Sequence, residues 1–220
     1  MAAIPCGYRG DEMKRVLIGC EESGTLTTKF REAGFECYSC DTEPTRGNPE
    51  WHYQMDVKEC IKKHGPWALI ILHPPCTSLA VCSNKHYAEG KPDHQQRLDD
   101  IDWTIDLWET AKKYAMRVAL ENPISVIFQY LMNGFFKAPV CYIQPHEHGH
   151  GETKKTGLAL YNLPPIYPTD EVDGREQRIW KMAPGPNRKR DRSATYPGIA
   201  DAIVDQWGSL LNTTNEQTTY

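Results

Sequence analysis

The sequence predicts an α/β fold built on a doubly wound, mainly parallel sheet. Short apolar runs alternate with amphipathic segments along the chain, at the spacing that strand–helix–strand units require. The clearest run, Trp67–Leu72, is continuously apolar, as expected of a strand buried on both faces. Polar side chains directly follow several of these runs, and an open parallel sheet binds its ligands at the carboxyl ends of its strands.

The composition fits one globular domain. The chain has 220 residues, of which 40% are hydrophobic and 25% are charged, which excludes a disordered or fibrous protein. No apolar run approaches the roughly 20 residues that span a bilayer, so no membrane partner is expected. The first residues lack the basic-then-apolar pattern of an export signal, which predicts a cytoplasmic protein. We expect a leader over residues 1–13, a single domain over 14–212 and a tail over 213–220.

The elements are expected in regular order. Residues 15–20 form the first strand, and residues 25–33 form a helix that Gly34 ends, because glycine readily adopts the left-handed conformation found after a helix. Residues 93–116 form a long amphipathic helix, and residues 197–210 form a last helix that Pro197 begins. The remaining strands are expected at residues 35–40, 53–57, 67–72, 117–120, 140–143 and 158–161.

The cysteines and histidines give no metal site. Eight cysteines in a chain of this length, without an export signal, are expected to be mostly reduced thiols. Cys37 and Cys40 have metal-ligand spacing, but no second pair accompanies them, and on a strand they point to opposite faces. His146, His148 and His150 alternate between glycines, which favours a mobile loop.

One segment departs from the acidic average. The formal net charge is −4, yet residues 174–192 carry seven Lys or Arg residues against two acidic ones. A local basic run is a better indicator of a nucleic-acid partner than net charge. Its densest part is Arg188, Lys189 and Arg190, and the alternative is a solvated basic loop.

The loop after the first strand is a candidate ligand site. Gly19, Glu21, Ser23 and Gly24 lie between the strand and the next helix, where backbone can approach a ligand, although a simple strand-to-helix turn is an equal alternative. An acid about 20 residues further along such a chain commonly binds ribose hydroxyls, which indicates Asp41, with Glu43 as a competitor. By the same argument, Asp56 is a candidate to receive an adenine amino group.

The segment His73-Pro74-Pro75-Cys76-Thr77 is the sharpest signal. Two prolines fix the backbone before the cysteine, so this thiol is expected to be exposed and oriented rather than packed in the core. One strand later, Glu121-Asn122-Pro123 repeats the arrangement. A carboxyl group there can remain protonated at neutral pH and donate a hydrogen bond, or it can pair with a nearby cation.

Taken together, these motifs resemble the C5-cytosine DNA methyltransferases, most of all the compact members seen in bacteriophages. The likeness spans roughly residues 14–210, and Cys76 with Glu121 is its specific part. It implies a sheet of the class I S-adenosylmethionine-dependent methyltransferase type, S-adenosylmethionine as cofactor, DNA as substrate and, for a phage protein, the host cytoplasm. Only about 70 residues separate Glu121 from the family-like C-terminal segment, so the target-recognition domain is reduced or absent, with residues 162–196 as a reduced recognition element.

The resemblance also implies roles for individual residues. Cys76 is the nucleophile, Glu121 binds the base, and a lysine, taken as Lys155, holds the base oxygen. The cofactor-binding residues are Gly19, Glu21, Ser23, Gly24, Asp41, Asp56 and Pro74. The DNA-binding residues are Pro75, Thr77, Asn84, Lys85, Asn122, Lys154, Arg188, Lys189 and Arg190.

The implied reaction is covalent. The Cys76 thiolate adds to C6 of a flipped cytosine, which makes C5 nucleophilic enough to accept a methyl group. Residues 77–91 are a candidate lid over the flipped base. Two alternatives remain open: C5 modification of a free pyrimidine nucleotide, and a catalytically inactive nucleic-acid-binding protein with the same fold.

Overall fold

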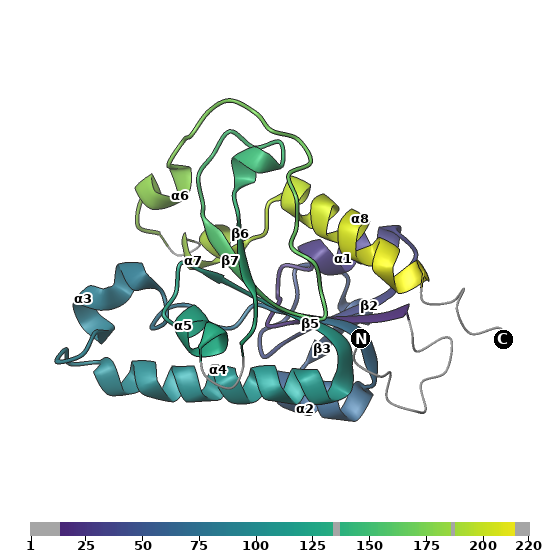
Figure 1. Cartoon of the computed structure of the whole chain (residues 1–220), viewed down its shortest axis with the longest axis horizontal. Coiled ribbons are helices and arrows are strands. Elements are labelled where there is room, and N and C mark those ends of the chain that lie inside the picture. The colour runs from purple at the N-terminus through teal and green to yellow at the C-terminus, as the bar shows by residue number, and fades with distance from the viewer. Residues whose placement is uncertain (1–13, 134–136, 186–187, 214–220) are drawn as a thin grey trace.

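The computed structural model describes residues 14–133, 137–185 and 188–213. The expected leader (1–13) and the tail from residue 214 onward lie outside the described residues. Seven strands form one sheet in the order β3-β2-β1-β4-β5-β7-β6 (Figure 1). The strands are β1 (Arg15–Gly19), β2 (Glu36–Asp41), β3 (His52–Gln54), β4 (Trp67–Leu72), β5 (Ala115–Pro123), β6 (Val140–Ile143) and β7 (Thr156–Tyr161).

The first five strands are mutually parallel, and β7 runs antiparallel to both β5 and β6. This is the fold class that the sequence predicts: a doubly wound, mainly parallel sheet. The helices that cover and connect it are α1 (Thr25–Glu32), α2 (Val57–His64), α3 (Asn84–Tyr87), α4 (His94–Tyr114), α5 (Ile127–Met132), α6 (Arg178–Lys181), α7 (Arg188–Ser193) and α8 (Pro197–Thr213).

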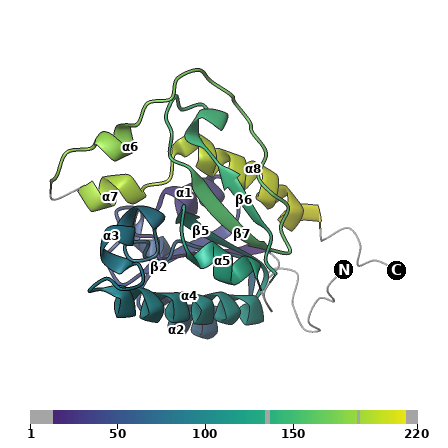
Figure 2. The same ribbon diagram turned by 60° about the vertical axis from the view of Figure 1, so that its left-hand side comes forward.

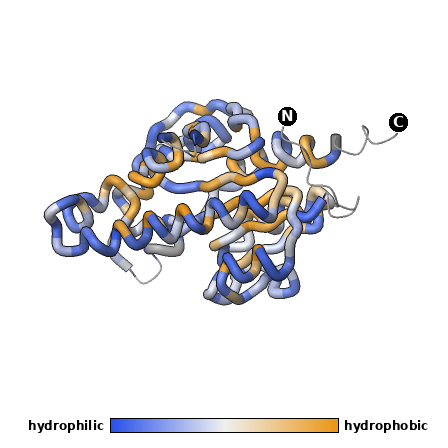
Figure 3. The backbone as a smooth tube through the Cα atoms, turned by 60° about the horizontal axis from the view of Figure 1, so that its bottom comes forward, coloured by the Kyte–Doolittle hydropathy of each residue, from blue (hydrophilic) through white to orange (hydrophobic). Residues whose placement is uncertain are grey.

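The sheet separates two hydrophobic cores. Val16 and Ile18 pack under α1 and α8, whereas Leu17 between them packs on the other face, under α2 and α4. This alternation follows from the two-residue repeat of a strand, and full burial of each such side chain contributes about 1.5–3 kcal/mol. In Figure 1, α1 and α8 lie on one side of the sheet and α2 and α4 on the other. In Figure 3, which brings α4 forward, hydrophobic and hydrophilic stretches alternate along the helix.

Several local predictions are confirmed. Gly34 has a φ of 86° and follows the C-cap of α1, and Pro197 begins α8. Cys37 and Cys40 are both fully buried but belong to the two different cores, so they do point to opposite faces of β2.

The fifth strand is longer than expected. The sequence places Glu121 and Asn122 after a strand that ends at Leu120, but β5 continues to Pro123. The extra residues pair with β7, where Glu121 lies opposite Leu158 and Asn122 opposite Gly157. A continuous apolar run marks the part of a strand that is buried on both faces. It does not show that an antiparallel partner, here β7, extends the strand beyond that part.

The region after β3 also differs from the prediction. The expected strand over 53–57 is instead His52–Gln54, and Val57 begins helix α2, which the sequence analysis missed. The Asp56 side chain accepts hydrogen bonds from the backbone N–H groups of Lys58 and Glu59. Asp56 is therefore an N-cap residue, a role that acidic side chains commonly take.

The carboxyl edge of the parallel strands carries the connections that matter for function. Helices α3, α6 and α7 lie on this side of the molecule in both Figure 1 and Figure 2. The segment 162–196 between β7 and α8 contains α6 and α7 in its described part and no strand of the main sheet. None of the described helices is long and apolar enough to cross a membrane.

Candidate active site

The strand register brings His73 and Glu121 together. Leu72 of β4 lies opposite Leu120 of β5, so the next residue of each parallel strand also lies side by side. His73 Nδ1 is 3.2 Å from Glu121 Oε2, and the two side chains are 16% and 22% exposed. His73 Nε2 is buried and has no hydrogen-bond partner among the described residues. His73 is not among the site residues predicted from the sequence, although its position directly after the buried strand Trp67–Leu72 indicates the carboxyl edge of the sheet.

Cys76 lies three residues further along the same loop, and it is exposed, as predicted. Pro74 is buried, and its carbonyl oxygen accepts a hydrogen bond of 3.1 Å from Asn122 Nδ2. The other side-chain atom of this amide, Asn122 Oδ1, is buried without a partner among the described residues. Strand β5 therefore fixes the start of the cysteine loop as well as presenting Glu121.

Helix α4 holds the rest of the loop through Arg97. This buried guanidinium group donates to the carbonyl oxygen of Ser78 at 2.7 Å and to that of Ala80 at 3.5 Å. It also donates to Asn84 Oδ1 at 2.8 Å. The Ser78 hydroxyl donates to Asp100 on the same helix. The expected lid over 77–91 thus contains a 3₁₀ turn and helix α3, and its first half is tied to α4.

The surroundings raise the pKa of Cys76 and lower the pKa of Glu121. Although Cys76 is exposed to solvent, partial desolvation by the surrounding protein raises the pKa of its thiol, the negative charge of Glu121 raises it further, and Lys154 lowers it. Burial acts to raise the pKa of Glu121, but the hydrogen bond and charge of His73, with the charge of Lys154, bring it below its ordinary value. Of the two alternatives for this carboxyl group, the arrangement favours pairing with a cation over a retained proton, because two basic partners stabilise the carboxylate.

Of the two adjacent lysines, Lys154 is the one that the structure brings to the site. Its charge acts on both Cys76 and Glu121, and it lines a pocket with Glu121. Lys155 is exposed, and its ammonium group lies 4.6 Å from the centroid of the Tyr142 ring. Successive residues of an extended segment point to opposite sides, so only one of the pair can face the carboxylate.

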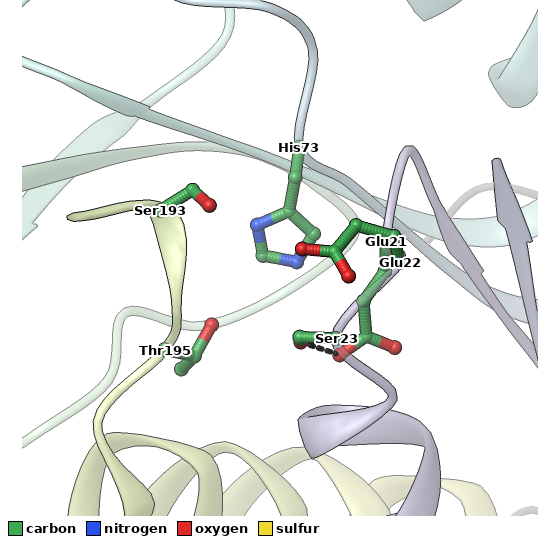
Figure 4. Close-up of a pocket in the computed structure, with 6 residues that line it drawn as sticks. All are labelled: Glu21, Glu22, Ser23, His73, Ser193 and Thr195. Carbon is green, nitrogen blue, oxygen red and sulfur yellow. Dashed lines mark hydrogen bonds between the residues drawn. The ribbon is translucent and has the colours of Figure 1, made fainter. Parts of the chain in front are cut away.

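Pocket A, a first pocket at the carboxyl edge, encloses about 270 Å³ of open space. In Figure 4 the His73 ring projects between the loop after β1 and the segment before α8. The lining residues are Glu21, Glu22, Ser23, His73, Ser193 and Thr195. The predicted loop residues Glu21 and Ser23 thus face a pocket together with the C-terminal segment.

Glu21 is also a structural residue. Its carboxylate accepts hydrogen bonds from the backbone N–H of Leu26 at 2.9 Å and from the Thr27 hydroxyl at 2.7 Å, so it stabilises the start of α1. Gly24 has a φ of 69°, and a Cβ atom there would lie 2.8 Å from the Cα of Gly47. Only glycine fits this turn without moving the neighbouring loop. Gly19 ends β1 opposite Leu72.

Pocket B, a second pocket of about 380 Å³, adjoins pocket A, because His73 and Thr195 line both. Its polar lining includes Glu121, Lys154 and Tyr196, and its walls are apolar side chains from the sheet and α8. A compact apolar pocket with a few convergent polar groups is the usual form of a small-ligand site.

The two acids predicted to bind the nucleoside end of a cofactor lie near the end of β1. The charges of Asp41 and Asp56 both raise the pKa of Cys20, which directly follows β1. One oxygen of Asp41, Oδ1, accepts a hydrogen bond of 3.0 Å from the Glu43 backbone N–H. The carboxyl ends of β1, β2 and β3 therefore converge, as the sequence predicts.

A cluster of polar contacts joins the basic segment to the site. Glu152 accepts from Arg178 Nε at 2.8 Å and from the Tyr196 hydroxyl at 2.6 Å. Desolvation and the hydrogen bond to Glu152 raise the pKa of Tyr196 to about 12, so the phenol stays protonated and donates. Because Tyr196 lines pocket B, the segment that carries α6 is anchored directly beside the candidate site.

The predicted DNA-binding residues are distributed along this edge. Pro75, Thr77 and Lys85 are exposed beside Cys76 and on α3, whereas Asn84 is engaged by Arg97. Arg188 on α7 is half-buried and donates to the carbonyl oxygen of Met182 at 2.9 Å. The side chains of Lys189 and Arg190 lie outside the described part of the chain.

Comparisons with known proteins give limited matches. No family model matches the chain, and no curated protein does. Three of the solved structures with a similar fold are each 12% identical to it. One, described as a DNA modification methyltransferase encoded within an E. coli prophage, covers 77% of this chain and 55% of its own, with a TM-score of 0.47.

The other two are also methyltransferases. The Entamoeba histolytica methyltransferase EhMeth covers 74% of this chain and 56% of its own, with a TM-score of 0.44. The S. pombe Dnmt2 methyltransferase covers 89% and 65%, with a TM-score of 0.42. The chain therefore spans between half and two thirds of the length of these proteins.

Proposed function

We propose that this protein is an S-adenosylmethionine-dependent DNA methyltransferase that modifies C5 of cytosine. The observation that carries the proposal is the grouping of an exposed thiol, a carboxylate and an ammonium group. Cys76, Glu121 and Lys154 come from three segments, and the charges of Glu121 and Lys154 both act on the Cys76 thiol. A nucleophile beside an acid and a cation is what addition to a pyrimidine ring requires.

Each residue has a distinct task in this reaction. The Cys76 thiol first loses its proton to water. The thiolate Sγ then forms a bond to C6 of the pyrimidine, and the ring electrons move toward N3. Glu121 faces N3 and the exocyclic amine, while Lys154 holds the ring oxygen O2 in place of the Lys155 first expected. When C5 has accepted the methyl group, loss of the C5 proton and of the Cys76 sulfur restores the aromatic ring. Because sulfur approaches from above the ring, the base must leave the duplex stack.

The residues of pocket A fit the cofactor that the motifs imply. Glu21 and Glu22 provide carboxylate oxygens on one wall, Ser193 and Thr195 provide hydroxyl groups on the other, and the His73 ring lies between them (Figure 4). This pattern suits a zwitterionic amino acid group, which carries an ammonium and a carboxylate. Asp41, at the end of β2, would hold the ribose. S-adenosylmethionine, when bound, supplies the electrophilic methyl group.

The proposed substrate is DNA rather than a free nucleotide. The exposed basic residues Arg175 and Lys181 belong to the segment anchored beside pocket B. They offer charge for the flanking phosphates of a polynucleotide, which a mononucleotide lacks. We further infer a cytoplasmic location, because the exposed thiols of Cys76 and Cys82 would be readily oxidised elsewhere.

The test is mass spectrometry of nucleosides after incubation of duplex DNA with the protein and isotopically labelled S-adenosylmethionine. We expect labelled 5-methylcytosine, and none from the Cys76→Ala variant, because removal of the thiol removes the bond to C6. Cofactor affinity should stay within a few fold in this variant.

Cys82→Ala is the matched control, because Cys82 is an exposed thiol on the same loop, and it should keep its activity. Label in dCMP but not in DNA would favour the nucleotide-modifying alternative. No label in either substrate, with DNA binding intact, would favour the inactive binding protein.

A further inference from the structure

His73 has features that the proposed reaction does not yet use. It contacts Glu121 through Nδ1, it lines both pockets, and its second ring nitrogen, Nε2, is buried without a partner among the described residues. A buried polar atom without a hydrogen bond is costly, which indicates that a ligand completes the contact. In Figure 4 the ring projects into pocket A, between the two walls that would hold the cofactor.

Glu121 lacks a proton that the reaction needs. N3 of a neutral cytosine is an acceptor, and it gains electron density when sulfur adds to C6. A carboxylate would repel this charge, whereas a carboxylic acid would donate to it. His73 and Lys154 favour the carboxylate form of Glu121 in the structure described, so the proton must come from a neighbour.

We propose that His73 is a positioning residue that makes the delivery of a proton to Glu121, as sulfur adds to C6, depend on the occupancy of pocket A. An anionic oxygen of the ligand in pocket A accepts a hydrogen bond from Nε2–H, while Glu121 accepts from Nδ1–H. Contact with an acceptor on each side stabilises the doubly protonated imidazolium ring. Ligand binding therefore takes up a proton. This inference rests on the proposed function, whose cofactor carries a carboxylate.

The proton balance is simple. In the loaded site the pair consists of an imidazolium ring and a carboxylate. As sulfur adds to C6 and the ring electrons reach N3, the Nδ1 proton passes to Glu121 and a proton passes from Glu121 to N3. His73 is left as a neutral ring that keeps its proton on Nε2, bound to the ligand. No other reactant is consumed.

Charged groups from several elements surround His73. Glu121 approaches from β5, Glu21 and Glu22 from the loop after β1, and Lys154 from the segment before β7. Glu22 is neutralised by Arg46, whose guanidinium is 2.6 and 2.7 Å from its carboxylate oxygens. Glu21 is engaged at the start of α1. The carboxylate in direct contact with the ring is Glu121, 3.2 Å from Nδ1.

The experiment is calorimetric titration of the intact protein with S-adenosylhomocysteine, which cannot react. Titrations near pH 7 in buffers of different ionisation enthalpy report the protons taken up on binding. We expect uptake of a fraction of a proton per ligand, and an affinity that falls as pH rises from 6 to 8, by at most about tenfold per pH unit.

The variant His73→Asn separates positioning from folding. Its amide nitrogen can replace Nδ1 as the donor to Glu121, but it cannot titrate. We expect the fold to be retained, measured by thermal unfolding, with proton uptake lost and the affinity independent of pH. His73→Gln, whose amide can replace Nε2, should likewise lose the uptake. His148→Gln is the matched control, because His148 also has a buried Nε2 without a partner among the described residues but lines neither pocket.

The role of the amino acid group of the ligand can be tested by the same titrations. 5′-Methylthioadenosine lacks the amino acid end, so it should bind without proton uptake to the wild type and equally well to His73→Asn. If wild-type protein binds S-adenosylhomocysteine without proton uptake, or if His73→Asn keeps the uptake, the inference is wrong and the proposed function stands. If the wild type binds no S-adenosylhomocysteine, both are wrong.

Discussion

Cys76 is held in its less reactive form by its own neighbour. The thiolate is the attacking species, and both burial and the charge of Glu121 raise the pKa of the thiol. The thiol is therefore expected to be weakly nucleophilic while Glu121 carries its negative charge.

Because the charge of Glu121 raises the pKa of Cys76, we predict that Glu121→Gln makes the thiol more reactive. Loss of the negative charge lowers the pKa of Cys76, which increases the thiolate fraction at neutral pH. Alkylation by iodoacetamide, followed by peptide mass spectrometry, should be several-fold faster at pH 7.5, and its rate should rise with pH in both proteins.

Cys82 provides the internal control, because it is also exposed and should react at a rate that changes little between the two proteins. Slower alkylation of Cys76 in the Glu121→Gln protein would contradict the electrostatic account. Methyl transfer should fall despite the more reactive thiol, because the amide cannot deliver a proton to N3.

At the scale of elements, α4 acts as a support for the cysteine loop. The contacts of Arg97 with Ser78, Ala80 and Asn84 replace the regular hydrogen bonds that this irregular segment lacks. An arginine can satisfy several acceptors from one buried position, since its guanidinium group has five donor N–H bonds. The loop is thus held by a helix and by Asn122 of β5 at its two ends.

We predict that Arg97→Leu destabilises the protein by about 1–3 kcal/mol, because the buried Ser78 carbonyl oxygen loses its donor, whereas that of Ala80 still accepts from the Ser83 N–H. Urea unfolding measures this change. Lys113→Leu, at an exposed position of the same helix, should change the unfolding free energy by only about 0.5 kcal/mol. Equal effects of the two substitutions would show that Arg97 does not support the loop.

For the molecule as a whole, the distribution of charge matters more than its sum. The net charge of −4 would repel DNA, but the basic segment and α3 lie on the same side as the candidate site (Figure 2). A protein that releases counterions from phosphates binds DNA with an affinity that falls steeply with salt. We therefore propose that the carboxyl edge of the sheet, with α3 and the basic segment, faces the DNA duplex.

Removal of two charges from this edge tests the orientation. In Arg175→Ala/Lys181→Ala, the slope of log affinity against log salt concentration should become shallower by up to about 2, measured by fluorescence anisotropy with duplex DNA. The control is Lys62→Ala/Lys63→Ala, which removes two exposed lysines at the far end of α2. A similar change in the control would mean that DNA contacts are spread over the surface.

The sequence by itself determined the sheet and much of the expected site. Buried parallel strands appear as continuous apolar runs, so Trp67–Leu72 was located directly, and the exposed position of Cys76 followed from the two prolines before it. These features depend on short-range patterns and on the rule that ligands bind at strand ends. They therefore need no knowledge of which segments pack together.

The tertiary structure alone decided the pairing of side chains. Three features depend on partners distant in the sequence: the choice of Lys154 over Lys155, the extension of β5 through Glu121 and the contact of His73 with Glu121. The capping role of Asp56 is local, because its partners are the N–H groups of Lys58 and Glu59. The protonation state of Glu121 also depends on distant partners, because a pKa reports the charges that surround a group in space. The local sequence does not specify which charged groups surround Glu121, because the packing of distant segments brings them there.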